Sequence, residues 1–179
     1  YLQVLHIPLQ AGSDSVLKDM KRGYTVSEYV SIVDAFKKAF PRMTISTDII
    51  CGFPTETDED FEKTLEIIRS TQPDIINISR FWPMEGTPAR RMEQLDGGVI
   101  KERTRALTKL YEQVAEERNK EWLGWEGRVL ISEEGKPGTW KGRNFAYKQV
   151  VVSGKDLLGK EMDVKVVDCS PFDLKAEIV

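Results

Sequence analysis

The chain has 179 residues, 40% of them apolar, and its 26 lysines and arginines against 29 aspartates and glutamates give a net charge of −3. This length accommodates one medium-sized domain and one small one, and the slightly acidic total argues against a protein that coats nucleic acid indiscriminately. No apolar run is long enough to span a membrane, so we expect a cytoplasmic protein that does not bind membranes.

The first 81 residues alternate predicted strands with predicted helices. Apolar runs predict strands over residues 1–8, 43–51 and 74–81. The capping pairs Thr25–Glu28 and Thr57–Asp60 predict the starts of the two intervening helices, and Pro41 ends the first of them. Short connections between alternating strands and helices predict parallel strands joined by right-handed crossovers. Three such units cannot close a barrel, so we expect an exposed edge strand.

The pattern changes from helical to strand-like near Gly124. Before this point, a loop rich in proline and glycine leads into a long charged helix predicted over residues 99–122. After it, alternating apolar and polar residues predict strands over residues 127–132, 145–152 and 162–167. Glycine-containing turns between them indicate a small barrel of four or five strands. We therefore predict an α/β domain over residues 1–122 and an all-β domain over residues 123–179.

The residues that commonly bind metals are few. Cys51 and Cys169 are far apart in the sequence, and their spacing provides neither a disulfide framework nor the ligands of a zinc or iron–sulfur site. We interpret Cys51 as a small apolar side chain at the end of a buried strand. The single histidine, His6, is expected to make structural hydrogen bonds rather than to bind a metal. We predict no metal ligands and no catalytic residue in this chain.

Polar and aromatic residues lie at or just after the ends of the predicted parallel strands. They are Gln10, Ser13, Asp48, Gly52, Glu56, Phe81, Trp82 and Pro83. Parallel strands direct their carboxyl ends toward one face, so these residues are expected to converge on a ligand site. Gly52 would let a flat ligand approach the backbone, whereas the acidic residues after Thr57 argue against a phosphate ligand there. The same spacing is equally typical of the rim of any α/β barrel.

Cations and aromatic residues interleave in the all-β region. They are Trp140, Lys141, Arg143, Phe145, Tyr147 and Lys148. Small β barrels bind looped RNA by stacking bases on exposed rings while cations contact phosphates. Strand alternation would place Arg143, Phe145 and Tyr147 on one face, where the two rings are more typical of the barrel core. Trp140, Lys141 and Arg143, close to a glycine-rich turn, are the better candidates for RNA contact.

Ordered sequence blocks resemble the radical SAM methylthiotransferases that modify tRNA. They read HIPLQAGSD at 6–14, MKR at 20–22, TDIICGFP at 47–54, ETDEDF at 56–61 and GTPA at 86–89. The all-β region resembles the TRAM domain of these enzymes. Residues 48–54 and 143–150 are most similar to the archaeal and eukaryotic branch, which methylthiolates threonylcarbamoyladenosine next to the tRNA anticodon. Departures from the family pattern occur at Ala11, Thr55 and residues 82–85.

The resemblance implies an α/β fold, namely the C-terminal half of a radical SAM (partial TIM-type) β/α barrel followed by a small OB-like TRAM barrel. It places S-adenosylmethionine across the strand ends, with Gln10 and Ser13 facing its methionine or ribose part. The strand end from Asp48 to Gly52 would line the adenosine. Phe81, Trp82 and Pro83 would form a wall beside the adenine.

Arg22 and Asp48 each have both a possible ligand-binding role and a purely structural explanation. The resemblance lets Arg22 pair with the carboxylate of S-adenosylmethionine, because a guanidinium matches that shape. A solvated surface charge explains Arg22 equally well. For Asp48, a strand-end side chain that caps local backbone amides is nearly as good an explanation as a contact with adenosine.

The resemblance also implies cofactors and partners. The parent enzymes use S-adenosylmethionine and [4Fe–4S] clusters, whose cysteine ligands this chain lacks, so we expect an excised fragment that does not cleave S-adenosylmethionine. Its expected partners are the missing N-terminal part of the same polypeptide and the anticodon arm of tRNA. The TRAM-like barrel would contact that arm through Trp140, Lys141, Arg143, Tyr147 and Lys148.

Other functions are also compatible with the sequence, and each shares either the chemistry or the RNA binding described above. The same chemistry could act on isopentenyladenosine in tRNA or on an aspartate of a ribosomal protein. A protein of another class, a non-catalytic RNA-binding adaptor, would use the α/β part only as a platform.

Overall fold

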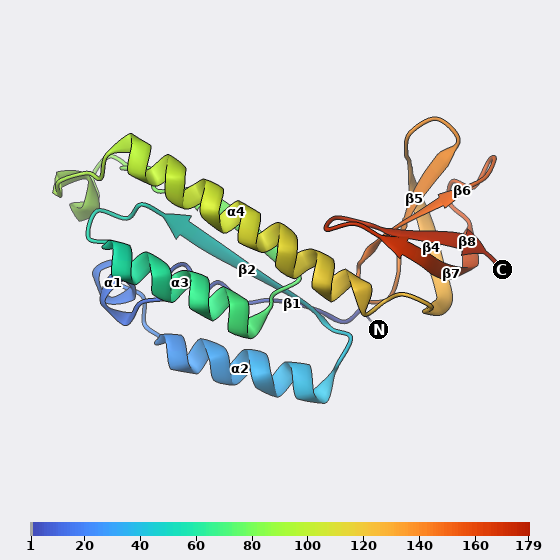
Figure 1. The fold of residues 1–179 in the computed structure, drawn as a ribbon, viewed down its shortest axis with the longest axis horizontal. Coiled ribbons are helices and arrows are strands. Elements are labelled where there is room, and N and C mark those ends of the chain that lie inside the picture. The colour runs from blue at the N-terminus through green and yellow to red at the C-terminus, as the bar shows by residue number, and fades with distance from the viewer. Residues whose placement is uncertain (1) are drawn as a thin grey trace.

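The computed structural model describes residues 2–179, which form an α/β unit followed by a β barrel (Figure 1). The α/β unit contains β1 (Val4–His6), α1 (Asp14–Asp19), α2 (Val26–Ala39), β2 (Thr44–Cys51), α3 (Asp58–Thr71), β3 (Ile75–Arg80), the short 3-10 helix η1 (Pro88–Arg91) and α4 (Gly97–Lys120). The β barrel contains β4 (Glu126–Glu134), β5 (Thr139–Arg143), β6 (Gln149–Ser153), β7 (Glu161–Cys169) and β8 (Leu174–Ile178).

The α/β unit is built on a three-stranded parallel sheet in the order β1-β2-β3. Ile45, Ile49 and Cys51 of β2 point to one face, where they join a buried cluster with residues of α2, α3 and α4. The alternate residues of the same strands point to the other face, which no helix of residues 2–179 covers. β1 and β3 are both edge strands among the described residues, as expected for an unclosed set of parallel strands.

Local signals in the sequence place the starts of α2 and α3 correctly. The Thr25 side chain accepts a hydrogen bond from the backbone amide of Glu28, whose side chain accepts one in return from the amide of Thr25, and Thr57 and Asp60 form the same capping box on α3. The long helix α4 starts two residues earlier than predicted. Its N-cap is Asp96, whose carboxylate accepts from the amides of Gly98 and Val99.

The β barrel is closed by five strands in the order β4-β5-β6-β8-β7. The strand predicted over residues 145–152 is partly wrong, because residues 144–148 form a loop and β6 begins only at Gln149. The loop forms because the Asn144 side-chain oxygen accepts hydrogen bonds from the amides of Ala146 and Lys148. This local pairing competes with a strand ladder. The barrel has one of the two predicted strand numbers, four or five, but the ranges of β5 and β8 were not predicted, and neither was the short helix α1.

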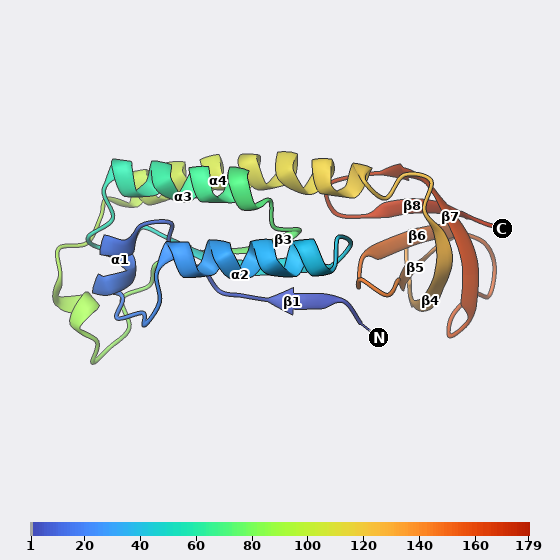
Figure 2. The same cartoon turned by 90° about the horizontal axis from the view of Figure 1, so that it is seen from below.

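The barrel packs against the end of the sheet where the strands begin (Figure 2). The amide of Gln3 donates to the carbonyl of Phe145 at 2.9 Å, and the Thr44 hydroxyl donates to the carbonyl of Ala146 at 2.6 Å. The loop over residues 144–148 therefore touches the start of both β1 and β2. The carboxyl ends of the strands lie at the opposite end of the α/β unit.

Candidate functional site

The carboxyl ends of the three strands meet at one edge of the sheet, as predicted. Gln10, just after β1, bonds through its backbone to Asp48 and Ile50 of β2. The amide of Phe81, after β3, donates to the carbonyl of Cys51 at 2.8 Å. Gln10 is buried and has a φ of 69°, an uncommon conformation for a residue with a side chain. These backbone pairings hold the three strand ends next to one another.

A row of polar side chains crosses the uncovered face of the sheet. His6 Nε2 lies 3.1 Å from Asp48 Oδ2, and His6 Nδ1 lies 3.0 Å from Ser46 Oγ. From the other side, Asn77 Nδ2 donates to Asp48 Oδ1 at 2.9 Å. Asp48 therefore links all three strands, and its side chain is still 31% exposed. This arrangement confirms His6 as a hydrogen-bonding residue and leaves a polar, accessible surface.

The turn after β2 is held by a buried ion pair. The Glu56 carboxylate accepts from the amide of Gly52 at 2.8 Å and from Arg103 Nη1 of α4 at 2.7 Å. Burial raises the pKa of Glu56, although the bonds from Gly52 and Arg103 oppose that shift. Asp58 binds the other terminal nitrogen of Arg103 at 2.7 Å. Arg103 was not predicted to reach this turn, because nothing in the local sequence distinguishes it from the other cations of the chain.

Packing by itself requires a glycine at residue 52. Its φ is +85°, and a Cβ there would lie 2.6 Å from Cγ1 of Ile100 on α4. The group that closely approaches Gly52 in this structure is the side chain of Ile100. The amide of Gly52, bound to Glu56, is also unavailable to a ligand.

Ser13 and Arg22 occupy contrasting positions. Ser13 is buried, and its hydroxyl donates to Asp60 Oδ1 at 2.6 Å, which ties the start of α1 to the first turn of α3. Burial favours the neutral form of Asp60, but bonds from Ser13 and Thr57 prevail and lower its pKa to about 2. Arg22 is exposed at the surface. Burial raises the pKa of Tyr24, with Arg22 lowering it and Asp48 raising it further.

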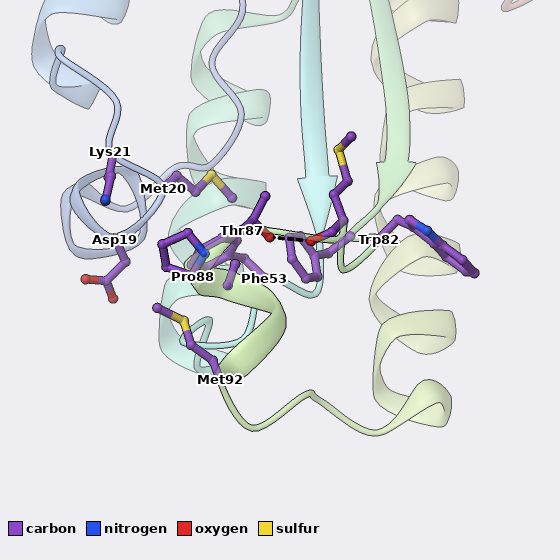
Figure 3. Close-up of a pocket in the computed structure, with 11 residues that line it drawn as sticks. Asp19, Met20, Lys21, Phe53, Trp82, Thr87, Pro88 and Met92 are labelled. Carbon is purple, nitrogen blue, oxygen red and sulfur yellow. Dashed lines mark hydrogen bonds between the residues drawn. The ribbon is translucent and has the colours of Figure 1, made fainter.

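An apolar hollow of about 290 Å³ opens beside the strand ends (Figure 3). Its lining comes from α1, the turn after β2 and the segment after β3, and includes Met20, Phe53, Phe81, Trp82, Pro88 and Met92. Phe53 and Phe81 pack edge to face with centroids 5.2 Å apart. Trp82 is 79% exposed and its indole points away from the centre of the hollow, while Pro83 is half-buried. An apolar wall is thus present, formed mainly by Phe53 and Phe81.

The predicted RNA-binding residues of the barrel separate into three groups. In the first group, Trp140 packs against the barrel core, and its indole nitrogen donates to the carbonyl of Gly154 at 3.1 Å. Lys141 is half-buried on β5 and lines an outer groove together with Lys136 and Lys175. Two acidic side chains also line this groove, and Lys175 pairs with Asp168 at 2.7 Å. Lys136 and Lys141 are therefore the lysines of the groove that form no ion pair among the described residues.

Arg143 and Tyr147 form the second group. The guanidinium carbon of Arg143 lies 4.9 Å from the centroid of the Tyr147 ring, and that ring is half exposed. Tyr147 therefore does not fill the core, contrary to expectation, because the loop over residues 144–148 turns it outward with a φ of 60°. Phe145 does pack inward, beside Trp122 and Trp125.

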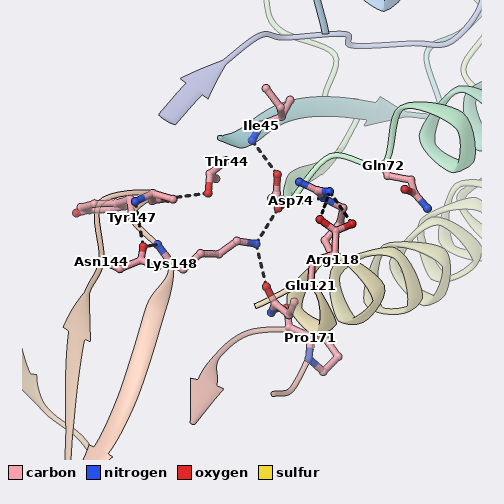
Figure 4. A network of polar contacts seen from close by, with 12 residues as sticks. Thr44, Ile45, Gln72, Asp74, Arg118, Glu121, Asn144, Tyr147, Lys148 and Pro171 are labelled. Atoms are coloured by element: carbon pink, nitrogen blue, oxygen red, sulfur yellow. Dashed lines mark hydrogen bonds and ion pairs between the residues drawn. The ribbon is translucent and has the colours of Figure 1, made fainter. Parts of the chain in front are cut away.

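Lys148 forms the third group and does not face solvent. Its ammonium donates to Asp74 Oδ1 and to Asn119 Oδ1, both at 2.8 Å, and its side chain is only 10% exposed (Figure 4). In this position Lys148 cannot contact RNA phosphates. The alternation that placed it on a strand face does not apply, because Lys148 belongs to the loop.

The residues present do not fit an iron–sulfur cluster. Cys51 is fully buried beneath the helices, and burial raises the pKa of its thiol to about 12. Cys169 lies in the barrel, and burial raises its thiol pKa as well. Between residues 2 and 179, no group of three or more histidine, cysteine or acidic side chains is arranged to hold a metal. No helix in this part of the chain is long and apolar enough to cross a membrane.

Comparisons with known proteins agree with the two-part fold. The Radical SAM superfamily model matches residues 2–68, and the TRAM domain model matches residues 123–179. A probable threonylcarbamoyladenosine tRNA methylthiotransferase of Archaeoglobus fulgidus is 47% identical over 165 residues, which cover 92% of this chain and 38% of the relative. The threonylcarbamoyladenosine tRNA methylthiotransferase of Xenopus laevis is 40% identical over 177 residues, or 98% of this chain and 32% of the relative.

A solved structure, the N-terminally deleted archaeal Elp3 of Methanocaldococcus infernus, aligns with a TM-score of 0.44 at 11% identity and covers 92% of this chain and 51% of that chain. The sequence matches confirm the resemblance to the radical SAM tRNA methylthiotransferases of archaea and eukaryotes. The chain thus combines a segment that matches the Radical SAM superfamily with one that matches the TRAM domain, and it spans between 32% and 38% of the length of these two relatives.

Proposed function

We propose that this chain is part of a radical SAM enzyme that adds a methylthio group to C2 of N6-threonylcarbamoyladenosine next to the tRNA anticodon. In this proposal the α/β unit supplies three of the barrel strands that surround the reaction. The TRAM barrel supplies contacts to the anticodon arm. By itself the chain is inactive, because its two cysteines cannot hold the cluster that this chemistry requires.

The uncovered face of the sheet is the observation that carries this proposal. Helices and the main apolar cluster cover one face, whereas the other presents the row His6, Asp48 and Asn77 to solvent. A complete parallel barrel encloses such a face as its interior and displays its ligands at the carboxyl ends of the strands. The polar row therefore fits the inner wall of a barrel that further strands complete.

S-adenosylmethionine is the proposed ligand of the strand ends. The residues around it are Gln10, Ser13, Arg22, Asp48, Gly52, Phe81, Trp82 and Pro83. Some of them would contact the ligand, and others would only support those that do. Asp48 and Arg22 keep accessible polar groups, and Phe81 offers an apolar wall. Ser13 and Gly52 hold the surrounding backbone in place and do not offer polar groups to the ligand, because these groups already bind Asp60 and Glu56.

RNA is the proposed partner of the barrel. Lys141 and Arg143 supply cations, and the half-exposed ring of Tyr147 supplies a surface on which an unpaired base can stack. Trp140 supports this surface from the core. Lys148 is excluded from the set of RNA contacts because its ammonium lies between the two parts of the protein.

A chimera tests the enzymatic proposal. Residues 2–179 would replace the matching segment of the Archaeoglobus fulgidus relative, and tRNA nucleosides would be analysed by mass spectrometry. We expect methylthiolated threonylcarbamoyladenosine, and its disappearance when Asp48→Ala is added. A chimera that binds S-adenosylmethionine and tRNA but leaves this nucleoside unmodified would refute the proposal.

Calorimetry on the chain itself tests its incompleteness. We expect S-adenosylmethionine to bind more weakly than micromolar, because only part of the strand-end site is present. Micromolar binding by residues 2–179 would show that the strand ends form a sufficient site without further strands.

A further inference from the structure

Asp74 is the centre of a buried polar cluster between the α/β unit and the barrel (Figure 4). Asp74 lies between α3 and β3, and its side chain is only 1% exposed. Oδ1 lies 2.8 Å from the Lys148 ammonium of the barrel loop and 3.4 Å from Nε of Arg118 near the end of α4. Oδ2 accepts from the amide of Ile45 at the start of β2. One carboxylate thus joins a strand, a helix and the barrel.

Asn119 extends this cluster. Its side-chain oxygen accepts from Lys148, and its side-chain nitrogen donates to the carbonyls of Ser170 and Pro171 in the barrel. We call Asp74, Arg118, Asn119 and Lys148 the junction cluster. All four residues are buried or nearly so. Salt therefore screens the attraction of Asp74 for Lys148 and Arg118 only a little.

We infer that Lys148 and Asp74 are positioning residues that hold the barrel in one orientation at the starts of the strands. A buried charge without its partner is costly, so the ammonium and the carboxylate keep their positions relative to one another. A hydrogen bond without charge, such as that between Thr44 and Ala146, specifies the orientation less strongly. The junction cluster therefore makes the two parts a single rigid body.

This fixed orientation limits which RNA can serve as substrate, a consequence that rests on the proposed function. The barrel contacts Gln3, Thr44 and Asp74 at the starts of the three strands, whereas the strand-end site lies beyond Cys51. The eight residues of β2 separate these ends by roughly 23 Å at about 3.3 Å per residue. An RNA bound to the barrel must extend along the α/β unit to reach the site. A structured stem-loop has that reach, and a free nucleoside does not.

Distance measurements between spin labels test the positioning role without RNA. Labels on Thr55→Cys and Ser153→Cys, both at exposed positions, would report one part relative to the other in a Cys51→Ala, Cys169→Ser background. We expect one narrow distance distribution for this parent, and a distribution at least twice as wide for Lys148→Met and for Asp74→Asn. Lys148→Arg, which keeps the cation, should restore the narrow distribution. Lys141→Met, which removes a lysine of the same barrel outside the junction cluster, should leave it narrow.

A second label pair, Ser153→Cys with Glu133→Cys, lies within the barrel and controls for folding. If this pair stays narrow in Lys148→Met while the pair between the two parts broadens, the barrel has changed its orientation but not its fold. An unchanged distribution between the parts in both Lys148→Met and Asp74→Asn would overturn the inference. That result would leave the proposed function intact, since it concerns the cluster and not RNA contact.

Discussion

Lys148 places its ammonium nitrogen 2.8 Å from Oδ1 of Asp74, a residue 74 positions earlier in the chain and in the other part of the protein. The lysine sits in a loop that the sequence makes look like a strand, among aromatic and basic residues typical of an RNA surface. Lys148 is instead nearly buried between the α/β unit and the barrel. A lysine in a basic and aromatic segment can thus have a structural role when a buried carboxylate lies within its reach.

Asp74→Ala should lower the free energy of unfolding strongly. The change leaves Lys148 buried without a carboxylate, whereas Arg118 keeps its bonds to Glu121. Breaking a buried pair by removing one partner costs about 3–5 kcal/mol. Urea titration followed by circular dichroism measures the decrease. Asp34→Ala, at an exposed position on α2, is the matched control and should change stability by less than about 0.5 kcal/mol. Equal decreases in the two variants would contradict a structural role for Asp74.

Gly52→Ala should destabilise the turn after β2. A side chain at a φ of +85° is strained, and the new Cβ would collide with Ile100. We expect a decrease in unfolding free energy of about 1–3 kcal/mol, of the order found for a residue held in an unfavourable backbone conformation. Adding Ile100→Ala should recover the part that comes from the collision. Gly23→Ala, where no atom lies within 4 Å of the added Cβ, should cost much less.

Asp60 should give the protein a distinct decrease of stability in acid. Its pKa falls from 3.8 in the unfolded chain to about 2 in the folded chain, so the folded state favours the carboxylate. The stability that this group contributes is complete above pH 3.8 and disappears as the pH falls through about 2. The difference in unfolding free energy between the parent and Asp60→Asn should therefore shrink as the pH falls from about 4 to about 2. A difference that stays constant over this range would show that Asp60 does not titrate as expected.

Neither cysteine should react readily in the folded protein. Burial raises the pKa of Cys51 to about 12 and that of Cys169 above its usual value, and the thiolate is the reactive form. Ellman's reagent at neutral pH should modify Cys51 only as fast as the α/β unit opens, and Cys169, which is half-buried, somewhat faster. Both thiols should react at once in urea. Rapid modification of Cys51 in the native protein would contradict its place in the core.

Removing cations from the proposed RNA surface should weaken binding and reduce its dependence on salt. The slope of log K against log salt becomes shallower by about one for each cation that no longer meets a phosphate. We expect this for Lys141→Ala and Arg143→Ala in titrations with an anticodon stem-loop. Lys165→Ala, an exposed lysine of the barrel that pairs with Glu126, is the control with the same change of charge. Equal effects of all three variants would indicate a general electrostatic attraction rather than a site.

Local sequence signals determined much of this structure. Capping boxes at Thr25 and Thr57, apolar runs and glycine turns predicted three parallel strands, their helices and a small barrel. These features follow from interactions within a few residues, which a sequence displays directly. The place where the strand ends meet was also predictable, because parallel strands share a direction.

Tertiary structure alone decided which polar groups are free. Ser13 and Gly52 lie where a ligand was expected, yet Asp60 and Glu56 occupy their polar groups. Lys148 is absent from the RNA surface because Asp74 lies opposite it. Whether a charged side chain meets solvent or a buried partner depends on residues far away in the sequence, and composition and spacing carry no record of those pairings.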